Sequence, residues 1–346
     1  MCPKESIITL SRQTGAFTIR TESRVNIFFY EGETGMKRNL MILFVLFSPY
    51  IMYGQRDLIP LNSQYLFNGL LINPAYAGSH DVLSFAGTFR KQWLGFEGAP
   101  VDYSAGFHWP MAKSKLGMGL ILRQEKVLNQ STSEIGLDYA FRFILGKGKM
   151  SFGLRTALNL FQEDPFKGDI RDPADPLFAE NRLQGSAMMP NFGFGMFYFS
   201  QRMYAGFSIP WFFSMPSGGS LSSFFTGESI LSHYNFLFTG GYYLKITDRF
   251  WFKPTFLLKY QPVSGLQYDV NGSFVLFDDY LWIGGGYRAD GTVIAMLDLQ
   301  LLNQLKLGFS WDYPTGIIRQ ATAGSMEFSV RYNFNFKVNA VSPRFF

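Results

Sequence analysis

The sequence contains few of the residues that carry redox and metal chemistry. Its 346 residues include one cysteine, Cys2, and three histidines, His80, His108 and His233, which are never close together in the sequence. One cysteine cannot form a disulfide within the chain, and the histidine spacing does not match a metal site. We therefore predict a protein without a disulfide, a metal ion or a cofactor.

Charge and long apolar runs are also scarce. Charged residues make up 16% of the sequence, whereas soluble domains carry about 25%. The net charge of +5 is too small and too scattered to indicate a nucleic-acid partner. No run reaches the roughly 18 to 20 apolar residues of a membrane-spanning helix. Aromatic residues, in contrast, reach 18%. A membrane protein without membrane-spanning helices must be a closed barrel, because only closure satisfies every backbone N–H and C=O group in lipid.

The amino terminus has the pattern of a secretory signal. A short basic stretch at 36–39 precedes an apolar run at 40–47, and the small residue Gly54 offers a cleavage site. We predict a signal peptide over 36–54 and interpret residues 1–35 as an upstream extension that is not native. A short anchor helix is the alternative, which the length of the apolar run disfavours.

From about residue 82 the chain alternates apolar and polar residues, which is the period of a β-strand. In the last strand one face carries Met326, Phe328, Val330, Tyr332, Phe334 and Phe336, and the other carries Glu327, Ser329, Arg331, Asn333, Asn335 and Lys337. A barrel in lipid turns its apolar face outward and lines its lumen with the polar face. Bases such as Lys253 and Lys259 fit a wet lumen and would be costly in a dry core.

Turn signals divide this region into about 14 strands, an even count as in bacterial barrels. The predicted strands cover 82–91, 100–109, 115–126, 131–144, 149–160, 190–200, 202–212, 230–245, 249–260, 265–277, 280–288, 291–302, 304–313 and 322–336. Tight connections tend to alternate with longer ones, which places the tight turns and both chain termini on the periplasmic side. The predicted fold is an all-β, transmembrane, antiparallel up-and-down β-barrel over 82–346, after a periplasmic segment at 55–81.

Three motifs are distinctive. Asn73-Pro74-Ala75-Tyr76-Ala77-Gly78 precedes the first strand, Arg90-Lys91-Gln92-Trp93 begins the first hairpin, and Ser342-Pro343-Arg344-Phe345-Phe346 ends the chain. Together they closely resemble the PorP/SprF family of Bacteroidetes outer-membrane proteins, which belong to the type IX secretion and gliding-motility machinery.

The resemblance implies a location in the outer membrane and an accessory role in exporting proteins such as adhesins or holding them at the surface. It implies three kinds of partner, namely membrane lipid, other secretion components and the exported proteins, and it brings no enzymatic activity. The strand pattern alone leaves an alternative open, a diffusion channel or transporter for small molecules, because porins share that pattern.

The resemblance and local chemistry together select candidate sites. Proline restricts both its own backbone and that of the residue before it, so Asn73-Pro74 favours a turn or an extended conformation. We hypothesise that residues 62–79 fold into the periplasmic mouth or the lower lumen as a partial plug. The alternative is that they only cap the barrel end and cover the first strand.

The first hairpin, residues 90–100, is expected on the extracellular side, either as a docking site for an exported partner or as an internal lid. Its candidate residues are Arg90, Lys91, Gln92, Trp93, Gly95, Phe96, Glu97 and Gly98. The acidic loop at 161–189 lacks the spacing of a calcium loop, so we expect solvated acids or partner contact there. His108 and Ser104 lack a third catalytic group, and we attribute the many glycines to sheet curvature and turns.

Overall fold

The computed structural model describes residues 62–111, 115–163, 185–212, 234–262, 265–277 and 279–334, and the backbone of three short amino-terminal strands. The chain divides into two compact units, Met1–Gly54 and Gln55–Phe346. In the first unit β1 (Thr9–Gln13), β2 (Ala16–Arg20) and β3 (Asn26–Tyr30) form an antiparallel sheet. The predicted signal peptide, most of the acidic loop and the carboxy-terminal motif lie outside the described residues.

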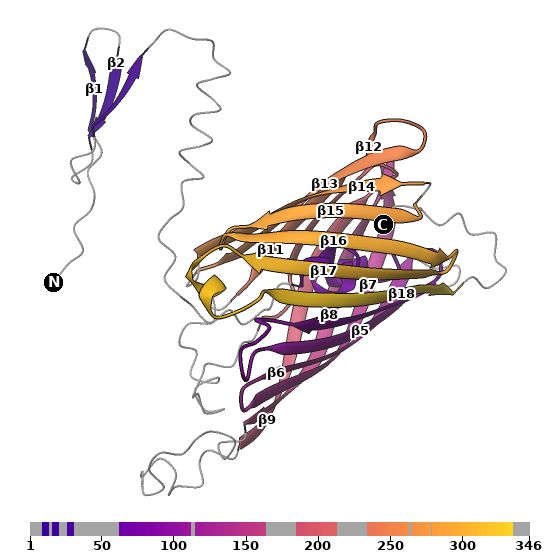
Figure 1. Ribbon diagram of the computed structural model, residues 1–346. Helices are drawn as coiled ribbons and strands as arrows, with labels where there is room; N and C mark the ends of the chain where they lie inside the picture. Colours follow the sequence, from indigo (N-terminus) through magenta and orange to yellow (C-terminus); the bar gives the residue numbers. More distant parts are fainter. Residues whose placement is uncertain are drawn as a thin grey trace, which may run out of the picture. The chain divides into compact units, whose positions relative to one another are not determined.

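The second unit is a closed antiparallel β-barrel (Figure 1). Its strands are β4 (Leu83–Lys91), β5 (Val101–Pro110), β6 (Leu116–Val127), β7 (Gln130–Leu145), β8 (Gly148–Glu163), β9 (Gly185–Phe199), β10 (Met203–Ile209), β11 (Phe236–Tyr242), β12 (Leu244–Lys245), β13 (Phe250–Gln261), β14 (Gly265–Leu276), β15 (Leu281–Arg288), β16 (Thr292–Leu302), β17 (Leu305–Pro314) and β18 (Ser325–Phe334). Consecutive strands pair along the chain, except that β11 and β12 both pair with β13, and β18 pairs with β4 to close the ring.

The predicted barrel of 14 strands is confirmed, with β12 continuing β11 along the same edge of β13. Most strand boundaries fall close to the predicted ones. A clear exception is β10, which ends at Ile209 rather than at residue 212. Pro210 follows, and proline has no N–H group with which to continue the ladder.

The faces of the sheet are reversed relative to a soluble protein. On β7 the apolar Ile135 is 56% exposed and the charged Asp138 is 0% exposed. The same alternation along most strands places apolar side chains outside and polar side chains inside, as the sequence predicts for a wall solvated by lipid. Among the described residues no helix is long and apolar enough to cross a membrane.

The two ends of the barrel differ in their connections. One end, the short-turn end, carries the tight links 111–115, 146–147, 200–202, 246–249, 277–280 and 303–304. The opposite end, the long-loop end, carries the longer links 92–100, 164–184, 210–235 and 315–324, the last of which includes η6 (Ile317–Gln320), and also the tight links 128–129, 262–264 and 289–291. All the long links lie at one end, as predicted, but tight links occur at both ends, so the alternation is partial.

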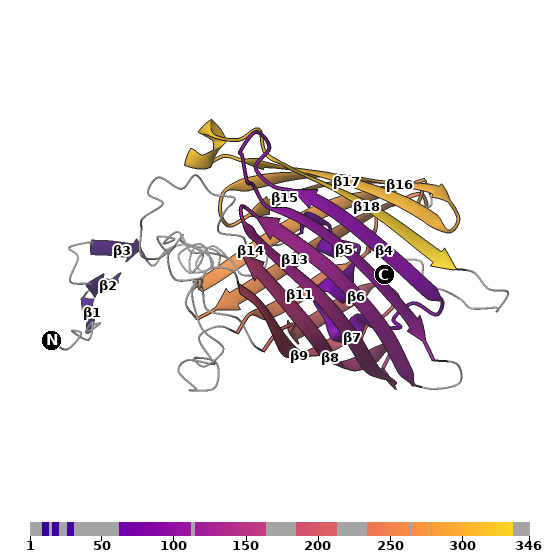
Figure 2. The ribbon, with the colours of Figure 1, turned by 90° about the horizontal axis from the view of Figure 1, so that it is seen from below.

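Three short 3-10 helices lie inside the ring of strands (Figures 1 and 2). They are η1 (Ser63–Leu66), η2 (Gly69–Leu71) and η3 (Pro74–Tyr76). η1 contacts β17 and β18, η2 contacts β5 and β6, and η3 contacts β7, β8 and β9. The main apolar core forms between these helices and the inner wall, with Leu70 and Tyr76 packed against Ile121 and Phe197.

Candidate functional site

The inner segment, residues 62–79, runs from one end of the barrel to the other. At its start Asn62 Nδ2 donates a hydrogen bond to Asp102 Oδ1 (3.4 Å), and Asp102 is the second residue of β5 at the long-loop end. At its end Gly78 lies against Gly117, the second residue of β6 at the short-turn end. The segment therefore extends beyond the lower lumen to which the sequence assigns it.

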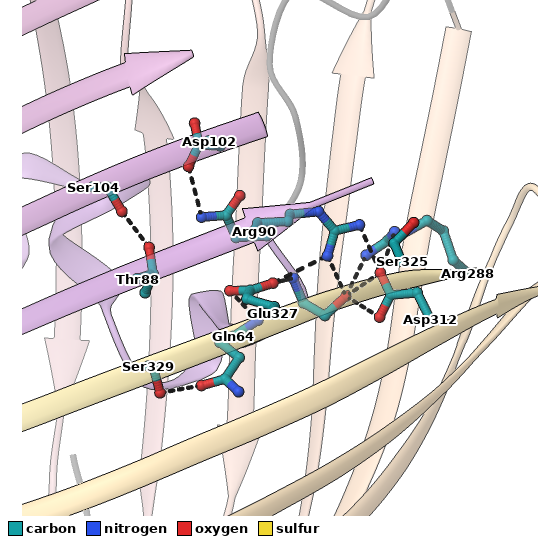
Figure 3. A network of polar contacts seen from close by, with 12 residues as sticks. Gln64, Thr88, Arg90, Asp102, Ser104, Arg288, Asp312, Ser325, Glu327 and Ser329 are labelled. Carbon is teal, nitrogen blue, oxygen red and sulfur yellow. Dashed lines mark hydrogen bonds and ion pairs between the residues drawn. The ribbon is translucent and has the colours of Figure 1, made fainter. Parts of the chain in front are cut away.

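A cluster of buried charges surrounds the first residues of the inner segment (Figure 3). The Ser63 hydroxyl donates to Asp312 (2.7 Å), and the Ser63 backbone N–H donates to Glu327 (2.8 Å). Arg90 forms ion pairs with the same two carboxylates, at 2.7 Å to Asp312 and 3.0 Å to Glu327. We call this group the loop-end polar cluster, consisting of Ser63, Arg90, Asp269, Arg288, Asp312 and Glu327.

Arg288, the last residue of β15, binds two carboxylates of the cluster, one on β14 and one on β17. It pairs with Asp269 at 3.0 Å and with Asp312 at 3.4 Å, and its Nη2 donates to Ser63 Oγ (3.1 Å). None of the cluster's charged side chains is more than 12% exposed. Burying an ion costs several kcal/mol unless it is paired and hydrogen-bonded. The cluster is therefore stable only while all of its partners are in place.

In the middle of the lumen a second buried ion pair holds η2. Arg155 Nε donates to Asp138 Oδ1 (2.7 Å), and Arg155 Nη2 donates to the Leu70 carbonyl oxygen (2.6 Å). A 3-10 turn leaves its last carbonyl groups without partners inside the helix. The guanidinium of Arg155, on the barrel wall, donates the missing hydrogen bond to the Leu70 carbonyl oxygen of the inner segment.

The structure gives a physical role to each part of the Asn73-Pro74-Ala75 motif. Asn73 Oδ1 accepts from the Ala75 N–H (2.9 Å) and so caps η3, whose first residue is Pro74. Proline suits that position because its fixed φ matches a helical turn and its absent N–H would have no partner there. Asn73 Nδ2 donates to the Met196 carbonyl oxygen (2.9 Å) and so joins the capped turn to β9.

The rest of the motif fixes the exit of the chain at the short-turn end. Tyr76 is packed against Phe197, and its hydroxyl lies 3.2 Å from His80 Nε2. Ala77 is fully buried. Gly78 has a φ of +67°, which favours glycine, and its carbonyl oxygen accepts a hydrogen bond from Arg142.

Glycines on the inner face of the wall form seats for the inner segment. A Cβ atom on Gly153 would overlap with the backbone of Ala75, and one on Gly117 would overlap with the Ala77 carbonyl group. A Cβ on Gly195 would overlap with the Asn73 side chain. Sheet curvature and turns therefore do not account for all of these glycines. At these positions the wall lacks side chains because the inner segment occupies their space.

A small cavity of about 30 Å³ lies between η3 and the wall, with Lys253 in its lining. The Lys253 ammonium lies over the rings of Tyr204 (5.4 Å), Tyr243 (4.9 Å) and Trp282 (5.0 Å), an arrangement typical of cation–π contacts. The cavity has room for about two water molecules. Lys253 thus lies among aromatic rings, whereas the sequence suggests a water-filled lumen around it.

The residues selected from the first hairpin, at the long-loop end, do not form one site, because Arg90 points away from the others. Arg90 faces the lumen, whereas Lys91 and Glu97 are exposed and Phe96 is 53% exposed. Gln92 N–H donates to the Pro100 carbonyl (2.9 Å) and closes the hairpin, while Gly95 and Gly98 have φ of +91° and +71°.

The same hairpin is fastened to the β17–β18 connection. Leu94 N–H donates to the Gly324 carbonyl (2.7 Å), and Ala323 N–H donates to the Leu94 carbonyl (3.1 Å). Trp93 N–H donates to Ser325 Oγ (3.2 Å). We call the two connections, 92–100 and 315–324, the loop-end rim.

His80 and His108 come together although 28 positions separate their numbers in the sequence, and their ring centroids are 4.9 Å apart. Tyr76 packs against both. Ser104, considered with His108 for catalysis, instead pairs with Thr88. Within the described part of the chain no group of three or more His, Cys, Asp or Glu residues could hold a metal ion.

Several wall residues that hold the inner segment are absent from the sequence-based selection. They are Asp138, Arg155, Asp269, Arg288, Asp312 and Glu327. Each lies on the polar face of a predicted strand, so the alternation places them in the lumen. It does not indicate which of them meet, because that depends on the register around the whole ring.

Comparison with protein families finds one match over most of the chain. Residues 55–332 match the model of the type IX secretion system membrane protein PorP/SprF. The comparison with curated protein sequences finds no match.

Solved outer-membrane barrels resemble the chain only distantly. The Acinetobacter baumannii outer membrane protein Omp33 is 5% identical, with a TM-score of 0.45, covering 74% of this chain and all of its own. The Ralstonia pickettii toluene transporter TbuX is 8% identical, with a TM-score of 0.46, covering 82% of this chain and 97% of its own.

Proposed function

Because the chain belongs to the PorP/SprF family of type IX secretion system membrane proteins, we propose that this outer-membrane barrel supports the export or surface attachment of secreted proteins, such as adhesins, by binding protein partners. Family membership carries the assignment to secretion. Membership also implies contact with other secretion components and with the membrane.

The filled lumen supports a binding role over a channel role. Buried ion pairs and hydrogen bonds hold the inner segment at both ends and in the middle, and inward glycines leave space for its backbone. A diffusion channel needs a continuous water-filled path. We propose that the inner segment acts as a plug and that partners bind outside the lumen, at the loop-end rim.

Deletion of the gene tests the proposed role. We expect the deletion strain to lose specific proteins from its surface while its growth on small nutrients is unchanged, as measured by mass spectrometry of surface fractions. A strain that keeps its surface proteins but takes up a nutrient poorly would support the alternative, a small-molecule channel. If surface proteins are lost as expected, co-purification from outer membranes identifies the bound secretion component or adhesin.

Single-channel recording tests the plug. We expect the intact barrel in a planar bilayer to show no stable ion conductance, because the inner segment occupies the lumen. A variant lacking residues 62–79 should conduct, provided that it folds, as judged by its resistance to SDS without heating. A large, steady conductance of the intact protein would contradict the plug.

A further inference from the structure

The two ends of the inner segment lie at opposite ends of the barrel. Ser63 contacts Arg90, the next-to-last residue of β4, and Arg288, the last residue of β15. Both strands run from the short-turn end to the long-loop end. Gly78, in contrast, accepts a hydrogen bond from Arg142 and lies beside Pro110, close to the short-turn ends of their strands. The chain thus enters the lumen at the long-loop end and leaves it at the short-turn end.

The inner segment contacts the wall on several sides of the lumen, with η1 against β17 and β18, η2 against β5 and β6, and η3 against β7, β8 and β9. A cavity beside it measures about 30 Å³ and holds about two water molecules. Asn62, next to Asp102, lies roughly two residues below the rim, or about 7 Å at the strand rise. The shortest exit from Asn62 is therefore through the long-loop end.

We propose that the inner segment is threaded through the barrel from the cell surface to the periplasm, with Asn62 beside the loop-end rim and Gly78 at the periplasmic end. The sequence alone places both termini in the periplasm. β18 ends at the short-turn end, which agrees with that expectation for the carboxy-terminal side. The amino-terminal side is different because the inner segment carries the chain through the barrel. The proposal does not depend on the role in secretion.

Thiol labelling tests this topology, because Cys2 is the only cysteine and a Cys2→Ser background leaves one introduced thiol per variant. Leu58→Cys reports on the chain ahead of the inner segment. Gly316→Cys lies at the long-loop end, and Lys147→Cys lies in an exposed tight turn at the short-turn end. Full-length variants in intact cells are treated with a polymer-linked maleimide that is too large to pass through porins.

We expect Leu58→Cys and Gly316→Cys to be labelled to the same extent in intact cells, and Lys147→Cys only after the outer membrane is permeabilised. Labelling of Leu58→Cys that appears only on permeabilisation, together with Lys147→Cys, would overturn the proposal. Labelling that appears only after denaturation would also overturn it, because residue 58 would then be buried. Labelling of Lys147→Cys but not of Gly316→Cys in intact cells would show that the long-loop end faces the periplasm, which would also overturn the proposal.

Discussion

The two ends of the inner segment are held by different physical means. At the long-loop end, Ser63 lies among buried guanidinium and carboxylate groups that it joins by hydrogen bonds. At the short-turn end, contact is mainly steric, with Ala75 and Ala77 seated on Gly153 and Gly117. The first kind of anchor depends on charge and fails when one partner is lost. The second depends on volume and fails when atoms are added.

Removing one carboxylate of the loop-end polar cluster should have the largest effect. Asp312→Ala leaves Arg90 and Arg288 buried with too few partners, and breaking a buried ion pair costs about 3–5 kcal/mol. Unfolding of the purified barrel in urea, followed by tryptophan fluorescence, measures the loss. The matched control is Asp248→Ala, which breaks the exposed pair with Lys245 and should leave the unfolding midpoint unchanged. Equal midpoints for Asp312→Ala and wild type would show that the cluster does not stabilise the fold.

Adding a side chain to a glycine seat should have the next largest effect. Gly153→Val places atoms where the Ala75 backbone lies, and overpacking costs about 1–3 kcal/mol. The control is Gly285→Val on the outer face of β15, where a Cβ meets only an ordinary contact at 3.5 Å. Comparison of the temperatures at which the two variants unfold in SDS distinguishes a loss of seating from a general cost of valine. A Gly153→Val barrel as stable as the control would contradict the seat.

Loss of the η3 cap should have a smaller effect. Asn73→Ala removes the acceptor of the Ala75 N–H and the donor to Met196, and losing such a cap costs about 0.5–2 kcal/mol. Asn73→Ser keeps a neutral oxygen that can cap η3 but loses the donor to Met196, so its urea midpoint should lie between those of Asn73→Ala and wild type. The reverse order of the two variants would show that the cap is not the important contact.

The smallest effect on stability is expected at the loop-end rim. Phe96→Ala removes an exposed ring and should leave the unfolding temperature unchanged. Under the proposed binding role it should reduce the amount of partner recovered with the barrel from outer membranes. Lys245→Ala, at the opposite end of the barrel, is the control. Full partner recovery with Phe96→Ala would remove this ring from the proposed docking surface.

The strands could be predicted from the sequence because alternation is a local property. The polar face of β4 includes Ser84, Thr88 and Arg90, in step with the alternation along the strand, although Arg90 and Lys91 were selected together as hairpin residues. The contacts of Ser63 could not be predicted in this way. Its partners Asp312 and Glu327 are 249 and 264 positions away in the sequence, and only the closed ring brings them together.

The inward glycines show a signal that is visible in the sequence but ambiguous. Gly117 and Gly119 recur at period two on the polar face of β6, a pattern that fits either a curved sheet or a close approach of another backbone. The inner segment resolves the ambiguity, because Leu70 approaches Gly119 while Ala77 approaches Gly117. From residue types alone, the two explanations are equivalent.

The seam between β4 and β18 joins the first and the last strand of the ring, so its closure fixes a very long loop of chain. Closing a loop costs conformational entropy that grows with its length. Ser63 bonds to Arg90 on one side of the seam and to Glu327 on the other. During assembly the stretch around Ser63 can therefore act as a template. It precedes β4 in the chain, and by binding β18 it lowers the conformational entropy that is still to be lost when the ring closes.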